Sequence, residues 1–210
     1  MARAENATPP AVKTIVLVRH GRIAWSFLTL IPGYALKEWR RGEDAAPLDT
    51  SYRPPRGGEL ERLVATAASL VASPLRRSLE SARLLAPAAE PLIDARFREA
   101  ELPAAIRSGV RLPAKVWAGL ARAAWFAGWA DGVESFRDAR ARAAGAAAIL
   151  CEHAETRGAV ALVGHGLMNI LIAGQLRAAG WRGPRLPSQR HWGYAVYDGL
   201  TAVRLTTRSA

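Results

Sequence analysis

The chain has 210 residues, of which 50% are hydrophobic and 22% charged, a composition typical of a globular protein and not of a disordered or fibrous one. Its length suffices for one hydrophobic core, so we expect a single domain. The formal net charge of +11 points to an acidic partner, such as nucleic acid, a membrane surface or a phosphorylated substrate. The basic residues are nearly all arginines spread along the chain, which disfavours a dedicated nucleic-acid interface and suits a small anionic substrate.

The single cysteine, Cys151, excludes an intramolecular disulfide and is compatible with a reducing compartment. The first ten residues lack the apolar segment of a signal peptide, and no run of about 18 apolar residues predicts a membrane-spanning helix. We therefore expect a cytoplasmic protein without a membrane partner. The sequence leaves a homodimer open.

Two short apolar runs, far apart in the chain, end in similar residues. Residues 14–18 lead into Arg-His-Gly and residues 160–163 into Gly-His-Gly, so His20 and His165 occupy matching positions. Each run is apolar at successive positions, which is typical of a buried strand in a parallel sheet. Because ligands bind at the C-terminal ends of the strands in open α/β sheets, we expect the two histidines to share one site.

The remaining elements alternate between helices and strands. Residues 1–13 are polar and are expected to form a flexible lead-in to one domain over residues 14–210. The alternation predicts an α/β protein whose sheet is mainly parallel with an antiparallel edge. In chain order we expect a helix at 34–41, a loop at 42–58, a helix at 59–68, a strand at 69–72, helix 75–85, a strand at 91–97, helices 113–129, 131–153 and 167–179, and a hairpin of strands 194–197 and 201–205.

The predicted helix that follows residues 69–72 has an arginine-rich start. Ser73 is expected to be its N-cap and Pro74 its first residue, which places Arg76 and Arg77 in the first turn. A helix N-terminus binds anions because its unpaired N–H groups and dipole favour negative charge, and arginine adds two-pronged binding of phosphate oxygens. No metal is expected, because zinc needs three or four ligands at a spacing that this sequence lacks.

These residues together resemble the histidine phosphatase superfamily, also called phosphoglycerate mutase-like. The family's Arg-His-Gly signature is matched by residues 19–21, its Ser-Pro-Leu-x-Arg-x-x-x-(Thr/Ser)-Ala signature by residues 73–82, and its second His-Gly pair by residues 165–166. The second match aligns the pocket arginine with Arg77 rather than with Arg76. The three motifs in this order span nearly the whole chain, and the resemblance implies a three-layer α/β/α fold.

The resemblance implies that the protein hydrolyses a phosphate monoester through a phosphohistidine at His20, without a metal or other cofactor. Arg19, Arg77 and His165 would bind the phosphoryl oxygens and stabilise the charge of the transition state. An imidazole attacks phosphorus only when it is neutral, and neighbouring arginines help to keep it so.

The general acid of this family is a glutamate after a mid-chain strand, and the stretch Phe97-Arg98-Glu99 resembles that position. Glu99 would protonate the leaving oxygen and then activate the water that releases phosphate. Glu101, two residues further on, stays open as the rival for this role.

The chain departs from the glycolytic mutases after Arg-His-Gly. Those enzymes continue with Glu-Thr or Gln-Thr and a Trp-Asn pair whose Asn touches the phosphate, whereas here Arg22 and Ser26 are the candidate substrate-binding residues. The departure favours a divergent phosphatase branch over a phosphomutase. A non-catalytic protein that binds phosphorylated ligands is a third alternative, and in each case the expected partner is a phosphorylated small molecule.

Residues from about 103 to 135 lie where this fold carries a helical, cap-like insertion. An aromatic face on the predicted helix is more often core than substrate wall, so we expect a packing role for Trp117, Trp125, Phe126 and Trp129. His153 and His191 are expected to be structural, and a place for His191 at the rim of the pocket is the alternative.

Overall fold

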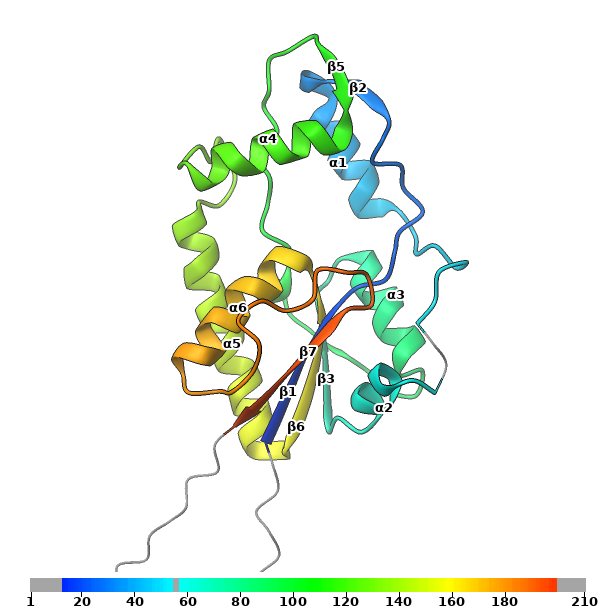
Figure 1. Cartoon of the computed structure of the whole chain (residues 1–210), viewed down its shortest axis with the longest axis vertical. Coiled ribbons are helices and arrows are strands. Elements are labelled where there is room, and N and C mark those ends of the chain that lie inside the picture. The colour runs from blue at the N-terminus through cyan, green and yellow to red at the C-terminus, as the bar shows by residue number, and fades with distance from the viewer. Residues whose placement is uncertain (1–12, 55–56, 200–210) are drawn as a thin grey trace, which may run out of the picture.

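A computed structural model describes residues 13–54 and 57–199, and its centre is a five-stranded sheet in the order β4-β3-β6-β1-β7 (Figure 1). Strand β7 runs antiparallel to β1 at one edge, and the other pairings are parallel. The prediction of a mainly parallel sheet with an antiparallel edge is therefore confirmed. The strands are β1 Lys13–Arg19, β3 Ser69–Ala72, β4 Leu92–Ile93, β6 Ala159–Gly164 and β7 Tyr194–Gly199.

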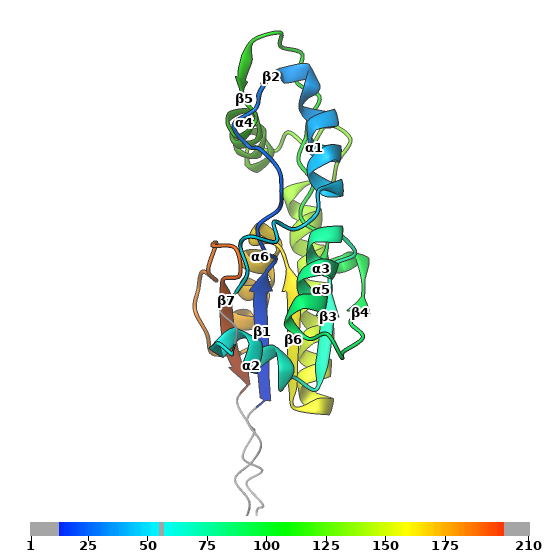
Figure 2. The same ribbon diagram turned by 90° about the vertical axis from the view of Figure 1, so that its right-hand side faces the viewer.

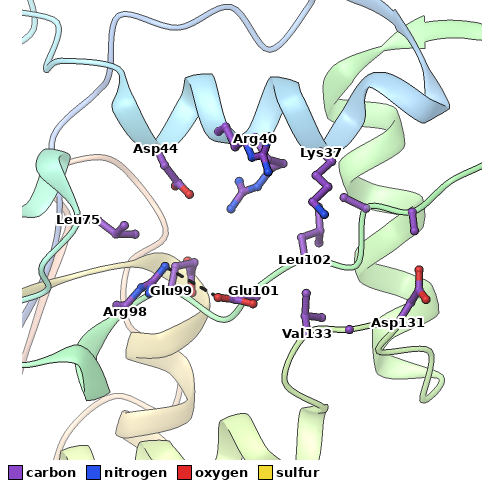
Figure 3. Close-up of a pocket in the computed structure, with 14 residues that line it drawn as sticks. Lys37, Arg40, Asp44, Leu75, Arg98, Glu99, Glu101, Leu102, Asp131 and Val133 are labelled. Carbon is purple, nitrogen blue, oxygen red and sulfur yellow. Dashed lines mark ion pairs between the residues drawn. The ribbon is translucent and has the colours of Figure 1, made fainter.

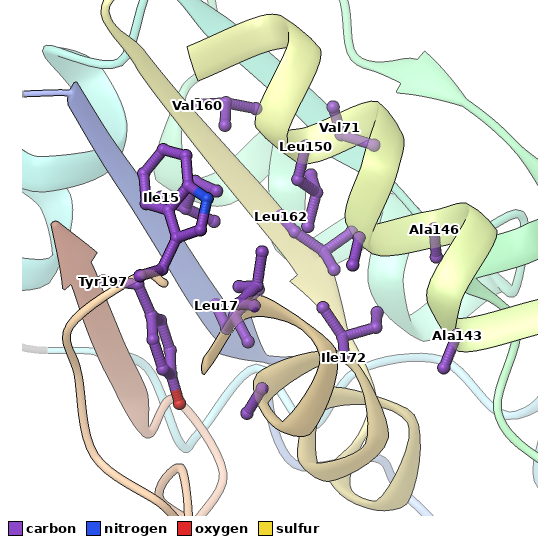
Figure 4. Close-up of a cluster of buried hydrophobic side chains, with 14 of the residues drawn as sticks. Ile15, Leu17, Val71, Ala143, Ala146, Leu150, Val160, Leu162, Ile172 and Tyr197 are labelled. Atoms are coloured by element: carbon purple, nitrogen blue, oxygen red, sulfur yellow. The ribbon is translucent and has the colours of Figure 1, made fainter. Parts of the chain in front are cut away.

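Helices cover both faces of this sheet because both faces of its central strands are apolar. In β1, Ile15 and Leu17 pack with α5 and α6 on one face (Figure 4), whereas Val16 and Val18 pack with α2 and α3 on the other. Alternate residues of a strand point to opposite faces, so one apolar run supplies both cores and the three-layer α/β/α fold follows. The four helices are α2 Glu59–Ala65, α3 Arg76–Leu85, α5 Phe136–Arg157 and α6 Gly166–Ala178.

A second, smaller unit lies beyond the C-terminal ends of the parallel strands (Figures 1 and 2). Two segments about 80 residues apart build it, since β2 pairs antiparallel with β5 and α1 lies near α4. Its core includes Ile31, Leu36, Trp39 and Trp117. We call this unit the cap, and it consists of β2 Leu30–Pro32, the 3-10 turn η1 Gly33–Ala35, α1 Leu36–Ala45, β5 Arg111–Pro113 and α4 Ala114–Phe126.

Several element predictions are wrong in their bounds. The helix expected at 34–41 continues to Ala45 as α1 and takes up the start of the loop expected at 42–58, and the helix expected at 59–68 ends at Ala65. The strand expected at 91–97 is limited to β4, because the Asp94 side chain accepts a bond from the Arg96 N–H and starts the 3-10 turn η2 Ala95–Phe97. Helix α5 begins at Phe136 and not at 131, because Ser135 and Asp138 form a capping box there. The predicted turn of the C-terminal hairpin includes Asp198, which instead lies in β7 opposite Thr14.

Two further predictions fall mainly outside the described residues, namely the flexible lead-in at 1–13 and the second hairpin strand at 201–205. Of these residues only Lys13 is described, and it begins β1. Within residues 13–54 and 57–199, no helix combines the length and apolar character that crossing a bilayer requires.

Candidate active site

The two histidines that follow β1 and β6 lie side by side, because these strands are parallel neighbours. Arg19 at the end of β1 is opposite Gly164 at the end of β6, and the His20 N–H donates to the Gly164 carbonyl at 3.0 Å. The ring centroids of His20 and His165 are 5.2 Å apart. The sheet thus brings together two residues that are 145 positions apart in the sequence (165 − 20).

The His20 ring is buried and held in one orientation. Its Nδ1 lies 2.7 Å from the carbonyl oxygen of Gly21, and because a carbonyl only accepts hydrogen bonds, Nδ1 carries the proton and Nε2 keeps a lone pair. Burial holds the pKa of His20 well below its usual 6.5, and the charges of Arg77 and Arg19 lower it further. The ring is therefore neutral at physiological pH, and its Nε2 is available as a nucleophile.

Gly21 is required by the packing around this ring. A Cβ at this position would lie 2.1 Å from the Trp192 side chain, and the Gly21 N–H donates to the Ser81 hydroxyl at 2.9 Å. The glycine of the Arg-His-Gly signature thus lets a tryptophan close over the backbone next to His20.

His165 is fully buried, and protein groups surround its ring. Nε2 lies 2.7 Å from the Ser73 hydroxyl and 3.2 Å from the Ser78 hydroxyl, while Nδ1 accepts a long bond of 3.4 Å from Arg77 Nε. Burial, followed by the charge of Arg77, also holds the pKa of His165 well below its usual value. Both ring nitrogens are already engaged, so His165 would contact a phosphoryl oxygen only if one of these bonds were exchanged.

The prediction that Ser73 caps the following helix is wrong. The N-cap of α3 is Leu75, in extended conformation and without a capping side chain, and Pro74 precedes the helix. The Ser73 hydroxyl accepts a bond from the Leu75 N–H at 3.3 Å and contacts His165. The serine of this signature is therefore explained by its contact with His165 and not by capping of α3.

The arginines differ in their surroundings. Arg77 is buried in the first turn of α3, facing His165, and its Nη1 donates to Asp44 of α1 at 2.7 Å. Arg76 instead points to the surface and pairs with Glu80 at 2.6 Å, so the structure turns Arg77 and not Arg76 toward the histidines.

Arg19 contributes an unused hydrogen-bond donor. Its Nη1 donates to the backbone carbonyl of Gln189, whereas its Nε is buried and has no hydrogen-bond partner among the described residues. A buried donor without a partner costs free energy, and an anion in the site would supply the missing acceptor.

Glu99 is held at the N-terminal end of α6, next to His165. Its carboxylate accepts backbone N–H bonds from Ala100 and Met168, both at 3.0 Å, and from Leu167 at 3.3 Å. Glu101 pairs only loosely with Arg98, at 3.8 Å, and is about half exposed. Glu99 is thus the better anchored of the two candidate acids.

Both carboxylates line a cavity of about 370 Å³ between the strand ends and the cap (Figure 3). Helix α1 supplies the opposite wall with Lys37, Arg40 and Asp44. Both walls of the cavity therefore carry cations as well as carboxylates. Such a lining suits a strongly polar ligand.

Arg22 and Ser26 lie in a different place. They line a second cavity of about 390 Å³ together with His191, and Arg22 pairs there with Asp49 at 3.5 Å. The structure therefore separates the two substrate-binding candidates after Arg-His-Gly from the two candidate acids.

His191 is a third imidazole beside His20, so its place agrees with the alternative at the rim of the pocket and not with the structural role expected first. Its ring centroid lies 5.5 Å from that of His20, and its Nδ1 lies 3.3 Å from the His20 carbonyl. Burial and the charge of Arg19 lower its pKa. The pairing of β7 with β1, with Tyr194 opposite Val18, brings the segment before β7 to the site. Knowledge of this pairing would have been needed to place His191 beside His20 from the sequence.

The aromatic residues of the cap segment lie away from both cavities. Trp117 and Trp125 are buried, and their indole N–H groups donate to the Ile31 and Glu134 carbonyls, so their predicted packing role is confirmed. Phe126 and Trp129 are partly exposed. His153 contacts the Ser69 hydroxyl at 3.1 Å, at the opposite end of β3 from the site.

In the part of the chain that the structure describes, no three side chains of His, Cys, Asp or Glu gather closely enough to hold a metal ion. The charged groups that act on His20 are instead Arg77 and Arg19. The positive charge in the candidate site thus comes from guanidinium groups, which bind the oxygens of phosphate two at a time.

Comparison with protein-family models finds a match to the sequence of this chain. A family model described as histidine phosphatase superfamily (branch 1) matches residues 55–195, well over half of the chain. The match includes Arg77, Glu99 and His165 but begins after His20. No curated protein is significantly similar to the chain in sequence.

Solved structures share the fold at low sequence identity. The Rv3214 open reading frame product of Mycobacterium tuberculosis is 19% identical, with 87% of this chain and 89% of that chain covered and a TM-score of 0.55. A phosphoglycerate mutase from Bacillus anthracis is 17% identical (91% and 92% covered, TM-score 0.52). A phosphoserine phosphatase from Entamoeba histolytica is also 17% identical (90% and 95% covered, TM-score 0.51).

Proposed function

The chain belongs to the histidine phosphatase superfamily, and from this premise we propose that it hydrolyses phosphate monoesters through a phosphohistidine intermediate at His20. The observation that carries the proposal is the state of the His20 ring, which is buried and neutral with a free Nε2 beside two arginines. A neutral imidazole nitrogen is a competent nucleophile toward phosphorus, and fixed positive charges stabilise the equatorial oxygens of the transition state.

In the first step, Nε2 of His20 forms a bond to phosphorus while the bond between phosphorus and the ester oxygen breaks. Arg77 and Arg19 would hold the phosphoryl oxygens, and the unpaired Nε of Arg19 supports this role because a phosphate oxygen would satisfy it. His165 would join them after exchanging its bond to Arg77 or to a serine hydroxyl.

Glu99 would supply the proton that the leaving oxygen needs. As the protonated acid it gives that proton to the ester oxygen, and as the carboxylate it then takes one from the water that attacks the phosphohistidine. The P–N bond breaks, phosphate leaves, and His20 returns to its neutral form. The position of Glu99 at the start of α6, next to His165 and held by three backbone N–H groups, supports this assignment over Glu101.

The proposal needs no metal, because the guanidinium groups neutralise the transferred phosphoryl group. Activity is expected to survive a chelator such as EDTA at full strength. Loss of activity with EDTA, restored by a divalent cation, would contradict this part of the proposal.

The test is to assay turnover of a nitrophenyl phosphate and covalent labelling by its phosphate in the His20→Ala variant. We expect both signals to vanish, whereas a His153→Ala control, which removes an imidazole far from the site, keeps both. A His20→Ala variant with unchanged turnover would overturn the mechanism. With a phosphate ester that carries a second hydroxyl, transfer of the phosphoryl group to that hydroxyl and not to water would instead identify a phosphomutase. Binding without any turnover would identify a non-catalytic protein.

A further inference from the structure

Large apolar side chains are exposed at the far end of the cap. Leu30, Tyr34 and Val110 lie on the β2–β5 ribbon and the segments next to it, and each is 58% to 68% exposed. The ribbon forms the end of the molecule opposite to the start of β1 (Figures 1 and 2). Exposed apolar residues that gather in one place, unlike scattered ones, indicate a contact surface.

The local structure explains why these side chains face outward. Ile31 and Leu112 are partners in the ribbon and pack in the cap core, whereas their sequence neighbours Leu30 and Arg111 are exposed. The Tyr34 N–H donates to the Ser108 carbonyl at 3.3 Å, which keeps Tyr34 close to the segment that holds Val110. Leu30, Tyr34 and Val110 therefore belong to one end of the cap.

Cations accompany the apolar residues, and the acid nearest in sequence, Glu38, is already paired with Arg41. Arg107, Arg111 and Lys115 are exposed, and none of them forms an ion pair with a carboxylate in the described part of the chain. Neither residues 22–37 nor residues 102–130 contain an Asp or a Glu. We call these three cations and the three apolar residues Leu30, Tyr34 and Val110 the tip.

We propose that the tip is a docking surface for an anionic phospholipid bilayer. Apolar side chains enter the boundary between headgroups and acyl chains, while lysine and arginine meet lipid phosphates, so both halves of the tip gain a partner. The net charge of +11 adds attraction to the same surface.

Other occupants satisfy only part of the tip. A nucleic acid would pair with the cations and leave Leu30, Tyr34 and Val110 in water. A second copy in a two-fold contact would cover the apolar residues but bring like charges together with no acid to neutralise them. The sequence expectation of no membrane partner considered a spanning segment, whereas the tip is assembled by folding from segments about 80 residues apart.

The test is co-sedimentation of the full chain with sucrose-loaded vesicles. With equal parts of phosphatidylglycerol and phosphatidylcholine, we expect binding about tenfold stronger than with phosphatidylcholine alone, and weaker binding at high salt. The double variant Leu30→Glu/Val110→Glu and the charge variant Arg111→Glu/Lys115→Glu should each lower binding about tenfold. Leu92→Glu/Ile93→Glu, which changes an exposed apolar pair on β4, is the matched control and should keep it.

None of the four tip residues changed in these variants lines either cavity near His20, so the result does not depend on the proposed phosphatase activity. Unchanged circular dichroism and melting temperature would show that each variant folds. The proposal is overturned if the protein ignores anionic vesicles, or if the tip variants bind as the control does. Concentration-dependent dimerisation that Leu30→Glu/Val110→Glu abolishes, without vesicle binding, would assign the tip to a second copy instead.

Discussion

In the sheet half of the molecule, the groups around the proposed nucleophile lie at the ends of buried strands or at the start of a helix that follows one. His20, His165 and Arg77 are all nearly inaccessible to solvent and hydrogen-bonded to the protein. In the cap, the residues that face the first cavity, such as Lys37 and Asp44, come from α1 and are more exposed. The buried strand ends of the sheet thus fix the reactive groups, whereas a more exposed helix of the cap forms the wall that a substrate would touch.

The largest effect is expected in the sheet half, from Glu99→Gln. Removal of a general acid typically costs a factor of about 10² to 10⁴, so turnover of an alkyl phosphate should fall by that amount. An aryl phosphate with a good leaving group needs little protonation and should lose much less. The measurement is kcat/KM for the two substrates, and equal losses on both would move the acid role to another residue.

The matched control for this variant is Glu101→Gln. Glu101 lines the same cavity but is half exposed and pairs only at 3.8 Å, so its loss should change kcat/KM by less than about threefold. If Glu101→Gln gave the larger loss on alkyl phosphates, the assignment of the two carboxylates would be reversed.

The next prediction compares how much the cores of the sheet half and of the cap contribute to the free energy of unfolding. Leu162 in β6 and Leu36 in α1 are both fully buried, and a Leu→Ala change at such positions costs about 2–5 kcal/mol of the free energy of unfolding. If sheet and cap unfold together, both variants lower one transition, as urea unfolding followed by circular dichroism will show. A separate early transition in Leu36→Ala alone would mean that the cap unfolds by itself.

The same division decides what the sequence predicts. Residues 69–72 and 160–163 are recognised because an apolar run reports a buried strand wherever its partners lie, and the motif residues follow those strands directly. The β2–β5 ribbon and the proximity of His191 to His20 come from pairings between distant segments, which no local pattern of residues encodes. Ser73 shows a third case, in which a residue suited to capping is used by a distant histidine.

A smaller effect concerns pH and again the sheet half. His20 and His165 have folded-state pKa values well below 6.5, mainly because of burial, so below pH 6.5 the unfolded chain binds more protons than the folded one. The free energy of unfolding should therefore decrease as the pH falls from 7.5 to 5.5, by at most about 1.4 kcal/mol per ring and pH unit. Urea unfolding at both pH values measures this decrease, and His165→Asn should make it smaller. An equal decrease in the variant and in the parent protein would contradict the assignment of this pH dependence to His165.

The smallest effect is expected where the two halves meet, at Asp44. Its carboxylate accepts a bond from Arg77 at 2.7 Å, so a phosphate on Arg77 competes with Asp44 and is repelled by it. Asp44→Asn keeps the size and removes the charge, and inorganic phosphate should then inhibit turnover about three to ten times more strongly. Glu38→Gln, which breaks an exposed pair with Arg41 on the same helix, is the control and should leave phosphate inhibition unchanged.

The sign of the Asp44→Asn effect distinguishes two roles for the cap. Tighter phosphate binding in the variant would mean that Asp44 pairs with Arg77 until the substrate takes the place of this carboxylate. The cap would then oppose the binding of inorganic phosphate. Weaker binding would mean that Asp44 orients Arg77 for its ligand. In that case a residue of the cap would help to position a reactive group of the sheet half, and the two halves would not have separate roles at this residue. The inhibition constant of phosphate, measured for the parent protein and both variants at one pH and salt concentration, separates these outcomes.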